Sequence, residues 1–288
     1  MTTHLLPKDP NRSGDFLFVD LYHGELGGRP DWVKIRDAAT PPGYEYIGGI
    51  IKATQGTSYD TTWFHTNYAA IASAAPARLG IDWFRGAYHY LVVLKDANLD
   101  HVRADAIAQA EFYVATVVKA GGWSGAVLPA VDLESASNAG VTRAQVEAAT
   151  SAFAQRVKEL TGRLVILYTR TLVKDLGITS HMGCDVLWAI DLSATLNNPP
   201  APGWTLAQTG LWQYGEDGKG NLAGAPLSVP GVGPTDVNIY IDGANKTTLM
   251  LLRARIVDPT VPGWLPDDKG GTPTSRHAAV AAMIAAKS

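Results

Sequence analysis

The sequence predicts an α/β protein that folds as an irregular, TIM-like β/α barrel with helices missing in the second half. Three observations support this fold class. Eight short apolar runs have the character of buried strands, helical patterns separate the runs of the first half, and loops rich in proline and glycine separate those of the second half. A barrel of this kind typically needs about 250 residues, and the chain has 288.

The eight apolar runs are rich in Val, Ile, Leu and aromatic residues. Strands that are covered on both faces look continuously apolar, because neither face meets water. The runs span residues 16–20, 46–53, 84–90, 126–132, 164–168, 186–190, 209–213 and 237–241. Eight is the number of strands that a small closed barrel requires.

Helical patterns fill the links of the first half. The clearest helix starts after Thr142, where the sequence Thr-Arg-Ala-Gln forms a capping box, and Gly162 provides a stop. Two more helices are expected at 97–120 and from Thr61 to an end or bend at Pro76. After residue 175 the links become Pro/Gly loops, so the second half of the barrel lacks long helices.

The chain divides into three parts by composition. We expect an N-terminal extension (1–14), a barrel domain (15–256) and a linker with a short Ala-rich tail (257–288). The linker is predicted from its Pro, Gly and Asp residues, which resist regular structure.

Composition excludes several partner classes. Hydrophobic residues make up 46% of the chain, the net charge is −3, and no long basic run is present, so no nucleic-acid partner is expected. Because no apolar stretch approaches the roughly 20 residues that span a bilayer, no membrane insertion is expected. The start of the chain lacks a signal peptide's apolar core, which indicates synthesis in the cytoplasm. Cys184 is expected to be a small core residue. No Cys/His cluster has zinc-ligand spacing, and neither a metal nor another cofactor is expected. The protein is expected to be a monomer.

The segment 128–134 carries the strongest chemical signal. It is an apolar strand that ends in Asp132 and Glu134. Residues two apart on a strand share a face, with Cα atoms roughly 6.6 Å apart. At the carboxyl end of a barrel strand that face looks toward the active-site mouth. Because like charges push the two pKa values apart, one carboxyl group can stay protonated while the other stays ionised. Glycoside hydrolysis needs both, an acid for the leaving oxygen and a carboxylate for the developing positive charge. Alternatively, both residues are ordinary solvated side chains at a strand exit.

Other strand ends carry matching side chains. Asp20 ends the first run, and Tyr88 shares a face with Tyr90 on the third. The segment 211–214 contributes two aromatics, and Asp236 opens the last strand. Carboxylates can catalyse and bind hydroxyl groups while aromatic rings stack on sugars, so the set favours a saccharide site.

Taken in order, these segments resemble glycoside hydrolase family 25, the lysozymes of the Chalaropsis type. The resemblance extends over residues 15–256 and rests on Asp20 after an apolar strand, I-K-A-T-x-G (51–56), G-A-Y-H-Y (86–90), D-L-E (132–134), L-Y-T (167–169), L-W-A (187–189), W-Q-Y (212–214) and D-V-N (236–238). Each motif is weak alone, but the ordered set is specific.

The resemblance implies an N-acetylmuramidase that acts on the glycan strands of peptidoglycan. It would cut the β-1,4 bond between N-acetylmuramic acid and N-acetylglucosamine. Glu134 would be the general acid, Asp132 would assist, for example by orienting the substrate's acetamido group, and Asp20 with Asp236 would complete an acidic ring. The residues implied to line the saccharide groove are Tyr88, Tyr168, Trp188, Trp212 and Gln213.

Two positions depart from the family pattern. Gln55 stands where the family commonly has Glu, and Tyr22 stands where it usually has Ser. Both leave the D-x-E pair and Asp236 in place, so they bear on substrate details at one side of the groove. The role of Lys52, in the same strand as Gln55, is open, and His89 is expected to face the outer helix layer.

Alternative interpretations stay open. Tyr168 and Trp188 could fill the barrel interior. A chitinase-like glycosidase usually carries more Asp residues before its acid, at positions that here are Leu128 and Ala130. A non-catalytic wall-binding module on the same barrel is the second alternative. The protein is expected to act on the cell wall after phage-type release, after injection as an effector, or after removal of a signal.

Overall fold

A computed structural model describes residues 15–22, 29–41, 44–75, 83–123, 126 and 128–241 of the chain. The N-terminal extension expected at 1–14, the end of the barrel range at 242–256 and the tail expected at 257–288 lie outside the described residues. Within the described part, no helix has both the length and the apolar character needed to cross a membrane.

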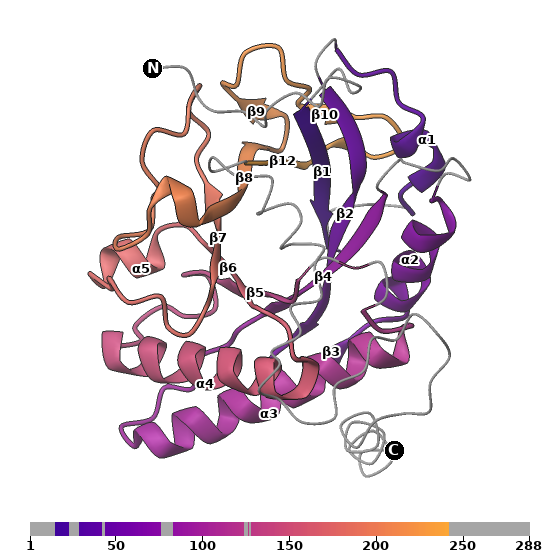
Figure 1. Ribbon diagram of the computed structural model, residues 1–288. Coiled ribbons are helices and arrows are strands. Elements are labelled where there is room, and N and C mark those ends of the chain that lie inside the picture. Colours follow the sequence, from indigo (N-terminus) through magenta and orange to yellow (C-terminus); the bar gives the residue numbers. More distant parts are fainter. Residues whose placement is uncertain are drawn as a thin grey trace.

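Eight strands close into a barrel (Figure 1). They are β1 (Asp15–Leu21), β2 (Tyr44–Gln55), β4 (Phe84–Tyr90), β5 (Ala130–Leu133), β6 (Ile166–Thr169), β7 (Val186–Ile190), β8 (Thr209–Glu216) and β12 (Asp236–Tyr240). Each pairs with the next in this order, and β12 pairs with β1 to complete the ring. The predicted eight-stranded barrel is therefore confirmed.

Seven of these strands run parallel, and β12 runs against both of its neighbours. The direction of β12 matters for the site. Because it is reversed, its first residue lies at the same mouth as the last residues of the parallel strands. Asp236, at the start of β12, is thereby the register partner of Asp20, near the end of β1.

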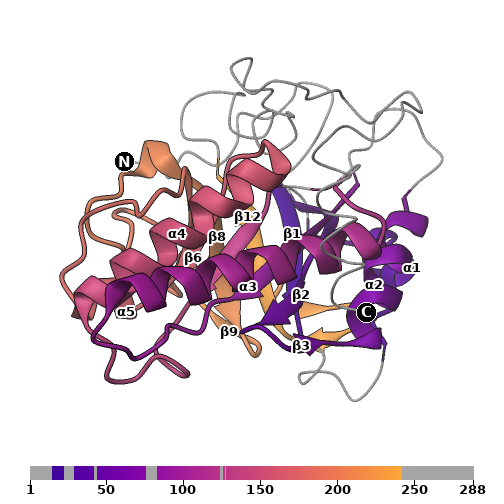
Figure 2. The ribbon, with the colours of Figure 1, turned by 90° about the horizontal axis from the view of Figure 1, so that it is seen from below.

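Within the described ranges, long helices cover the first half of the barrel only. They are α2 (Thr62–Ser73), α3 (Leu99–Lys119) and α4 (Arg143–Thr161), and α3 lies beside α4 in both ribbon views (Figures 1 and 2). The remaining helices are single turns: α1 (Trp32–Arg36), α5 (Leu172–Asp175) and a 3₁₀ turn at Leu206–Gln208. Short pairings complete the structure at β3 (Tyr59–Asp60), β9 (Lys219–Gly220), β10 (Ser228–Val229) and β11 (Gly233–Pro234).

Helix α4 begins and ends where its sequence predicts. The Thr142 side chain accepts from the backbone N–H of Gln145, and the Gln145 side chain accepts from the backbone N–H of Thr142. Gly162 ends the helix in the left-handed conformation, with φ of 68°, which glycine adopts without a Cβ clash. The helix therefore needs no distant contact to set its limits.

Apolar side chains form two layers, one inside the barrel and one between the barrel and its outer cover. Phe18 and Leu211 belong to the inner layer, whereas Val131 and Phe153 belong to the outer one. His89 faces outward, as expected: its ring stacks on Phe153 at 4.8 Å, and burial lowers its pKa to about 3, so it is neutral. Cys184 is buried in the outer layer, in agreement with its predicted role as a core residue.

Candidate active site

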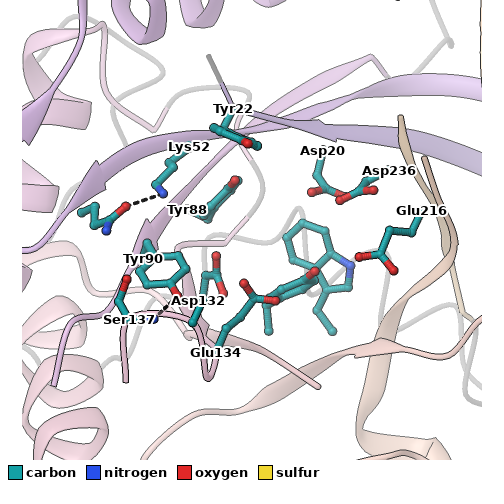
Figure 3. A pocket seen from close by; sticks show the side chains of 14 residues that line it. Asp20, Tyr22, Lys52, Tyr88, Tyr90, Asp132, Glu134, Ser137, Glu216 and Asp236 are labelled. Carbon is teal, nitrogen blue, oxygen red and sulfur yellow. Dashed lines mark hydrogen bonds between the residues drawn. The ribbon is translucent and has the colours of Figure 1, made fainter. Parts of the chain in front are cut away.

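A pocket of about 360 Å³ opens at the end of the barrel where the parallel strands finish (Figure 3). Side chains from all eight barrel strands, and from the loops after β1 and β5, surround it. The lining residues are Asp20, Tyr22, Lys52, Gln55, Tyr88, Tyr90, Asp132, Glu134, Ala136, Ser137, Tyr168, Trp188, Glu216 and Asp236. The structure thus brings together all four carboxylates singled out in the sequence.

Asp132 lies on β5, between Tyr90 of β4 and Tyr168 of β6. Its carboxyl group is buried, with 5% of the residue exposed, and its Oδ1 atom has no hydrogen-bond partner among the described residues. Burial, followed by the charge of Glu134, raises its pKa well above the usual value, and Lys52 opposes this shift. Burial therefore favours the protonated form of Asp132, and the charge of Lys52 offsets this preference only in part.

Glu134 follows β5 and points into the same pocket. Burial and the nearby Glu216 raise its pKa, while Arg170 and Lys52 lower it. The buried side chain of Asn138 holds the backbone here: its Nδ2 donates to the carbonyl of Glu134 at 2.8 Å and to that of Leu91 at 3.0 Å. Asn138 is therefore a positioning residue that sequence analysis missed, because its partners lie in two different loops.

Asp20 and Asp236 face each other across the β1–β12 pairing. Asn238 Nδ2 donates to Asp20 Oδ2 at 2.6 Å, and Trp188 Nε1 donates to Asn238 Oδ1 at 2.8 Å. Burial, then the charges of Glu216 and Asp217, raise the pKa of Asp236 to about 7. Asp20 is therefore held in place by hydrogen bonding, whereas Asp236 titrates near neutral pH.

The aromatic residues form the floor of the pocket. Tyr88, Tyr168 and Trp188 line it and also belong to the apolar layer inside the barrel. Tyr168 and Trp188 pack edge to face, with ring centroids 4.8 Å apart. The interior-packing and pocket-lining interpretations of these two residues therefore hold together, since the same rings do both.

Trp212 does not line the pocket, and its expected place in the groove needs correction. Its ring belongs to the outer apolar layer, and its Nε1 donates to the carbonyl of Asp191 at 2.6 Å. The cause is strand alternation: Leu211 and Gln213 face the barrel interior, so Trp212 faces outward. Gln213 is buried below the pocket, where its Oε1 accepts from the Tyr168 hydroxyl at 2.7 Å.

Glu216, at the end of β8, is a pocket carboxylate that the sequence did not single out. Its Oε2 pairs with Arg170 Nη1 at 3.0 Å, which links the ends of β8 and β6. A carboxylate near the end of a predicted strand was the available signal. The apolar run that marked this strand stops three residues earlier, however, and therefore left Glu216 in the loop.

Lys52 occupies the side of the pocket away from Asp236 (Figure 3). Its Nζ donates to Gln55 Oε1 at 2.6 Å. The same nitrogen lies 4.5 Å from the ring centroid of Tyr90, 5.5 Å from that of Tyr59 and 5.7 Å from that of Tyr22. Rings at these distances attract a cation through their electron-rich faces, so four side chains hold the ammonium group.

This arrangement can both donate a proton and stabilise positive charge. Two adjacent carboxyl groups with raised pKa values can share a proton, and the other carboxylates can face a cationic reacting centre. Among the described residues, no group of three or more His, Cys, Asp or Glu side chains is arranged to hold a metal ion.

Comparison with protein families identifies a match to the model of glycosyl hydrolases family 25 over residues 28–223, more than half of the chain. An N,O-diacetylmuramidase of Chalaropsis sp is 36% identical over 127 residues, which are 42% of this chain and 53% of the relative. An N,O-diacetylmuramidase of Arthroderma benhamiae is 30% identical over 135 residues, 43% of this chain and 49% of the relative. The matched region spans about half the length of these curated relatives.

Solved structures share the fold. A bacterial lysozyme from Streptomyces coelicolor superposes with a TM-score of 0.61 at 23% identity and covers 83% of this chain and 97% of its own. A muramidase from Acremonium alcalophilum gives a TM-score of 0.58 at 21% identity, with 82% and 98% coverage. A family 25 lysozyme from Aspergillus fumigatus gives 0.58 at 19% identity, with the same coverage. At these identities the likeness establishes the barrel architecture.

Proposed function

Since this chain belongs to glycosyl hydrolases family 25, we propose that it is a peptidoglycan hydrolase that acts on the bacterial cell wall. Specifically, we propose an N-acetylmuramidase that cleaves the β-1,4 bond between N-acetylmuramic acid and N-acetylglucosamine. The observation that carries the proposal is the Asp132–Glu134 pair at the mouth of the barrel, in which Asp132 is buried, Glu134 is partly buried and both pKa values are raised. The muramidase names of two partial relatives support the choice of substrate.

Glu134 is assigned as the general acid. Burial and the charge of Glu216 favour its protonated form, so it can deliver a proton to the oxygen that leaves the sugar. Arg170 and Lys52 limit this shift, and the proton therefore stays transferable. A carboxyl group with no opposing cation would hold its proton more firmly and donate it less readily.

Asp132 is assigned to assist at the reacting centre. Its Oδ1 lacks a hydrogen-bond partner in the described pocket, and the N–H of a substrate acetamido group is a donor of suitable chemistry. A hydrogen bond from that N–H favours the ionised form of Asp132 and lowers its pKa. Substrate binding would then leave the shared proton on Glu134, where the leaving oxygen needs it.

Asp20 and Asp236 are assigned to the positive charge that develops on the sugar ring in the transition state. Their carboxyl groups lie on paired strands at the pocket wall, and Asn238 fixes one of them. Fixed carboxylates stabilise a developing cation without having to reorganise during the reaction. Tyr88, Tyr168 and Trp188 are assigned to contact the saccharide.

The test is product analysis by mass spectrometry after digestion of purified peptidoglycan. The proposed enzyme releases muropeptides that end in reducing N-acetylmuramic acid. Reducing N-acetylglucosamine would show that the other glycosidic bond is cut, and faster release from chitin oligomers would favour the chitinase-like alternative. A folded protein that sediments with sacculi but releases no reducing ends from pH 4 to 8 would be a binding module. A Glu134→Gln variant is the matched control, since it should bind sacculi and release nothing.

A further inference from the structure

The two edges of the pocket differ in charge. Asp20, Asp236 and Glu216 lie together at one edge, and Lys52 lies with Tyr22 at the other (Figure 3). Among the described residues that line the pocket, Lys52 is the basic one, against five carboxyl groups. An anionic substituent on a bound glycan would therefore be repelled at the first edge and attracted at the second.

The ammonium group of Lys52 is held rather than left mobile. Its Nζ donates to the side-chain oxygen of Gln55 at 2.6 Å and lies within 6 Å of the rings of Tyr22, Tyr59 and Tyr90. These residues come from β2, the end of β1, β3 and β4. A lysine fixed by several elements loses less conformational entropy when it binds an anion.

Both departures from the family pattern meet at this ammonium group. Gln55 is a neutral amide, so its hydrogen bond positions Lys52 without adding negative charge at this edge. Tyr22 is 37% exposed, and among the described residues it is the one aromatic side chain in the set of exposed large hydrophobic residues. Its ring lies at the pocket rim beside Lys52, where it can pack against the apolar part of a substrate group.

We propose that Tyr22, Lys52 and Gln55 form a specificity subsite that binds a carboxylate carried by the N-acetylmuramic acid unit. This inference rests on the proposed function and names the substrate group that the site selects. The carboxylate has two sources of the same chemistry: the lactyl group itself when the stem peptide is absent, or an acidic residue of the stem peptide. Binding of this carboxylate at Lys52 orients the glycan strand so that no substrate carboxylate faces Asp20, Asp236 and Glu216.

The test compares matched glycan strands with and without the carboxylate. One pair consists of peptide-free strands with a free lactyl carboxylate and the same strands converted to the methylamide. A second pair consists of peptide-bearing strands before and after amidation of their carboxylates. The ratio of kcat/KM within each pair is the readout, which cancels general effects of a variant on catalysis. For the wild type, one pair should give a ratio of about ten, the size of a charged hydrogen bond.

Lys52→Met and Gln55→Glu should each lower that ratio toward one, because the first removes the cation and the second gives it a carboxylate partner. Lys52→Arg should keep most of the preference. Lys119→Met, on the exposed end of α3, is the matched control and should leave the ratio unchanged. The pair that responds identifies the source of the carboxylate. A ratio near one for the wild type, or an unchanged ratio in both pocket variants, overturns the subsite.

Binding measurements separate this inference from the proposed function. Dissociation constants for labelled strands are measured with Glu134→Gln alone and combined with Gln55→Glu. A wild-type protein that releases no reducing ends contradicts the muramidase proposal, whereas preference for carboxylate strands in binding would still support the subsite. A hydrolase that lacks that preference retains its function and loses the subsite.

Discussion

The pocket contains two carboxylate pairs that the chain assembles in different ways. Asp132 and Glu134 are two residues apart, share one strand, and owe their raised pKa values mainly to burial. Asp20 and Asp236 come from opposite ends of the barrel sequence and meet only because β12 closes the ring. Asn238 fixes Asp20 with a 2.6 Å hydrogen bond, whereas Asp132 Oδ1 has no hydrogen-bond partner in the described part of the chain. The first pair is suited to hold a proton. In the second pair a hydrogen bond fixes Asp20, whereas Asp236 has a pKa raised to about 7.

Residues of the same type can therefore have different roles within one site. A carboxyl group that moves a proton needs a pKa poised by its surroundings, and strong anchoring of its ionised form would lower that pKa. A carboxylate that stabilises developing charge needs fixed orientation instead. Substitutions in the two pairs should therefore give different kinetic signatures.

The largest effect is expected for Glu134→Gln. The amide cannot donate a proton to the leaving oxygen, and losing a general acid typically costs on the order of 10²–10⁴ in rate. Turnover of peptidoglycan fragments is measured by release of reducing ends, with circular dichroism as the check on folding. Near-normal turnover in a folded variant would place the acid on another residue and remove the distinction between the two pairs.

Asp132→Asn and Asp236→Asn should each reduce kcat by roughly 10²-fold while changing KM little. Asp132 is assigned to assist at the reacting centre and Asp236 to the charge that develops there, and both roles belong to the transition state. Steady-state kinetics on a soluble glycan fragment would separate the two parameters. If one variant mainly raises KM, that residue contributes to ground-state binding only. Such a result for Asp236 alone would sharpen the comparison between the pairs.

The two buried asparagines offer a matched test of positioning. Asn138→Ala removes the side chain that fixes the backbone at Glu134, and Asn238→Ala removes the one that fixes Asp20. Each should lower the free energy of unfolding by roughly 1–3 kcal/mol, since buried partners lose their hydrogen bonds. Only the first should also move the alkaline limb of the pH–rate profile. Urea unfolding and kinetics from pH 4 to 8 measure both effects, and identical profiles would show that the pairs are not separate.

The free energy of unfolding should fall as pH rises from about 4 to 7. Asp236 has a folded-state pKa of about 7, above the value of about 3.9 for an unfolded Asp, and Asp132 and Glu134 are raised as well. The native state therefore binds more protons in this window, and this stabilisation is lost as pH passes the folded-state values. Carboxylates with lowered pKa values, such as Asp31, change the free energy of unfolding at pH values below this window. Thermal unfolding of wild type and Asp236→Asn at several pH values measures how steeply stability falls with pH, and the fall should be smaller in the variant. A wild-type stability that rises from pH 4 to 7 would contradict this prediction.

The smallest effect concerns the charges around the acid. Glu216 raises the pKa of Glu134 and Arg170 lowers it, and both are about 40% exposed, so solvent screens their influence. Arg170→Met should move the alkaline limb of the pH–rate profile to higher pH, and Glu216→Gln should move it to lower pH, each by less than about one unit. Shifts of the same sign in both variants would show that they act by disturbing structure.

The sequence alone determined the features that depend on local pattern. The apolar runs indicated the barrel, and the capping box and Gly162 set the limits of α4. Strand alternation placed Asp132 and Glu134 on one face, because residues two apart on a strand always share it. The ordered motifs indicated the family. Each of these inferences needs only residues that are close in the chain, or an order along it.

Tertiary structure alone decided the rest. The reversed direction of β12 brings Asp236 to the mouth, and no local pattern reports strand direction. Trp212 faces outward because the other side of β8 meets the barrel interior. The sequence does not indicate which side this is, because Gln213 has an aromatic residue on each side of it. The meeting of Tyr22, Lys52 and Gln55 depends on how β1 and β2 lie beside each other. Long-range pairing fixes all three, because register and direction are set by contacts between strands rather than by the residues within one.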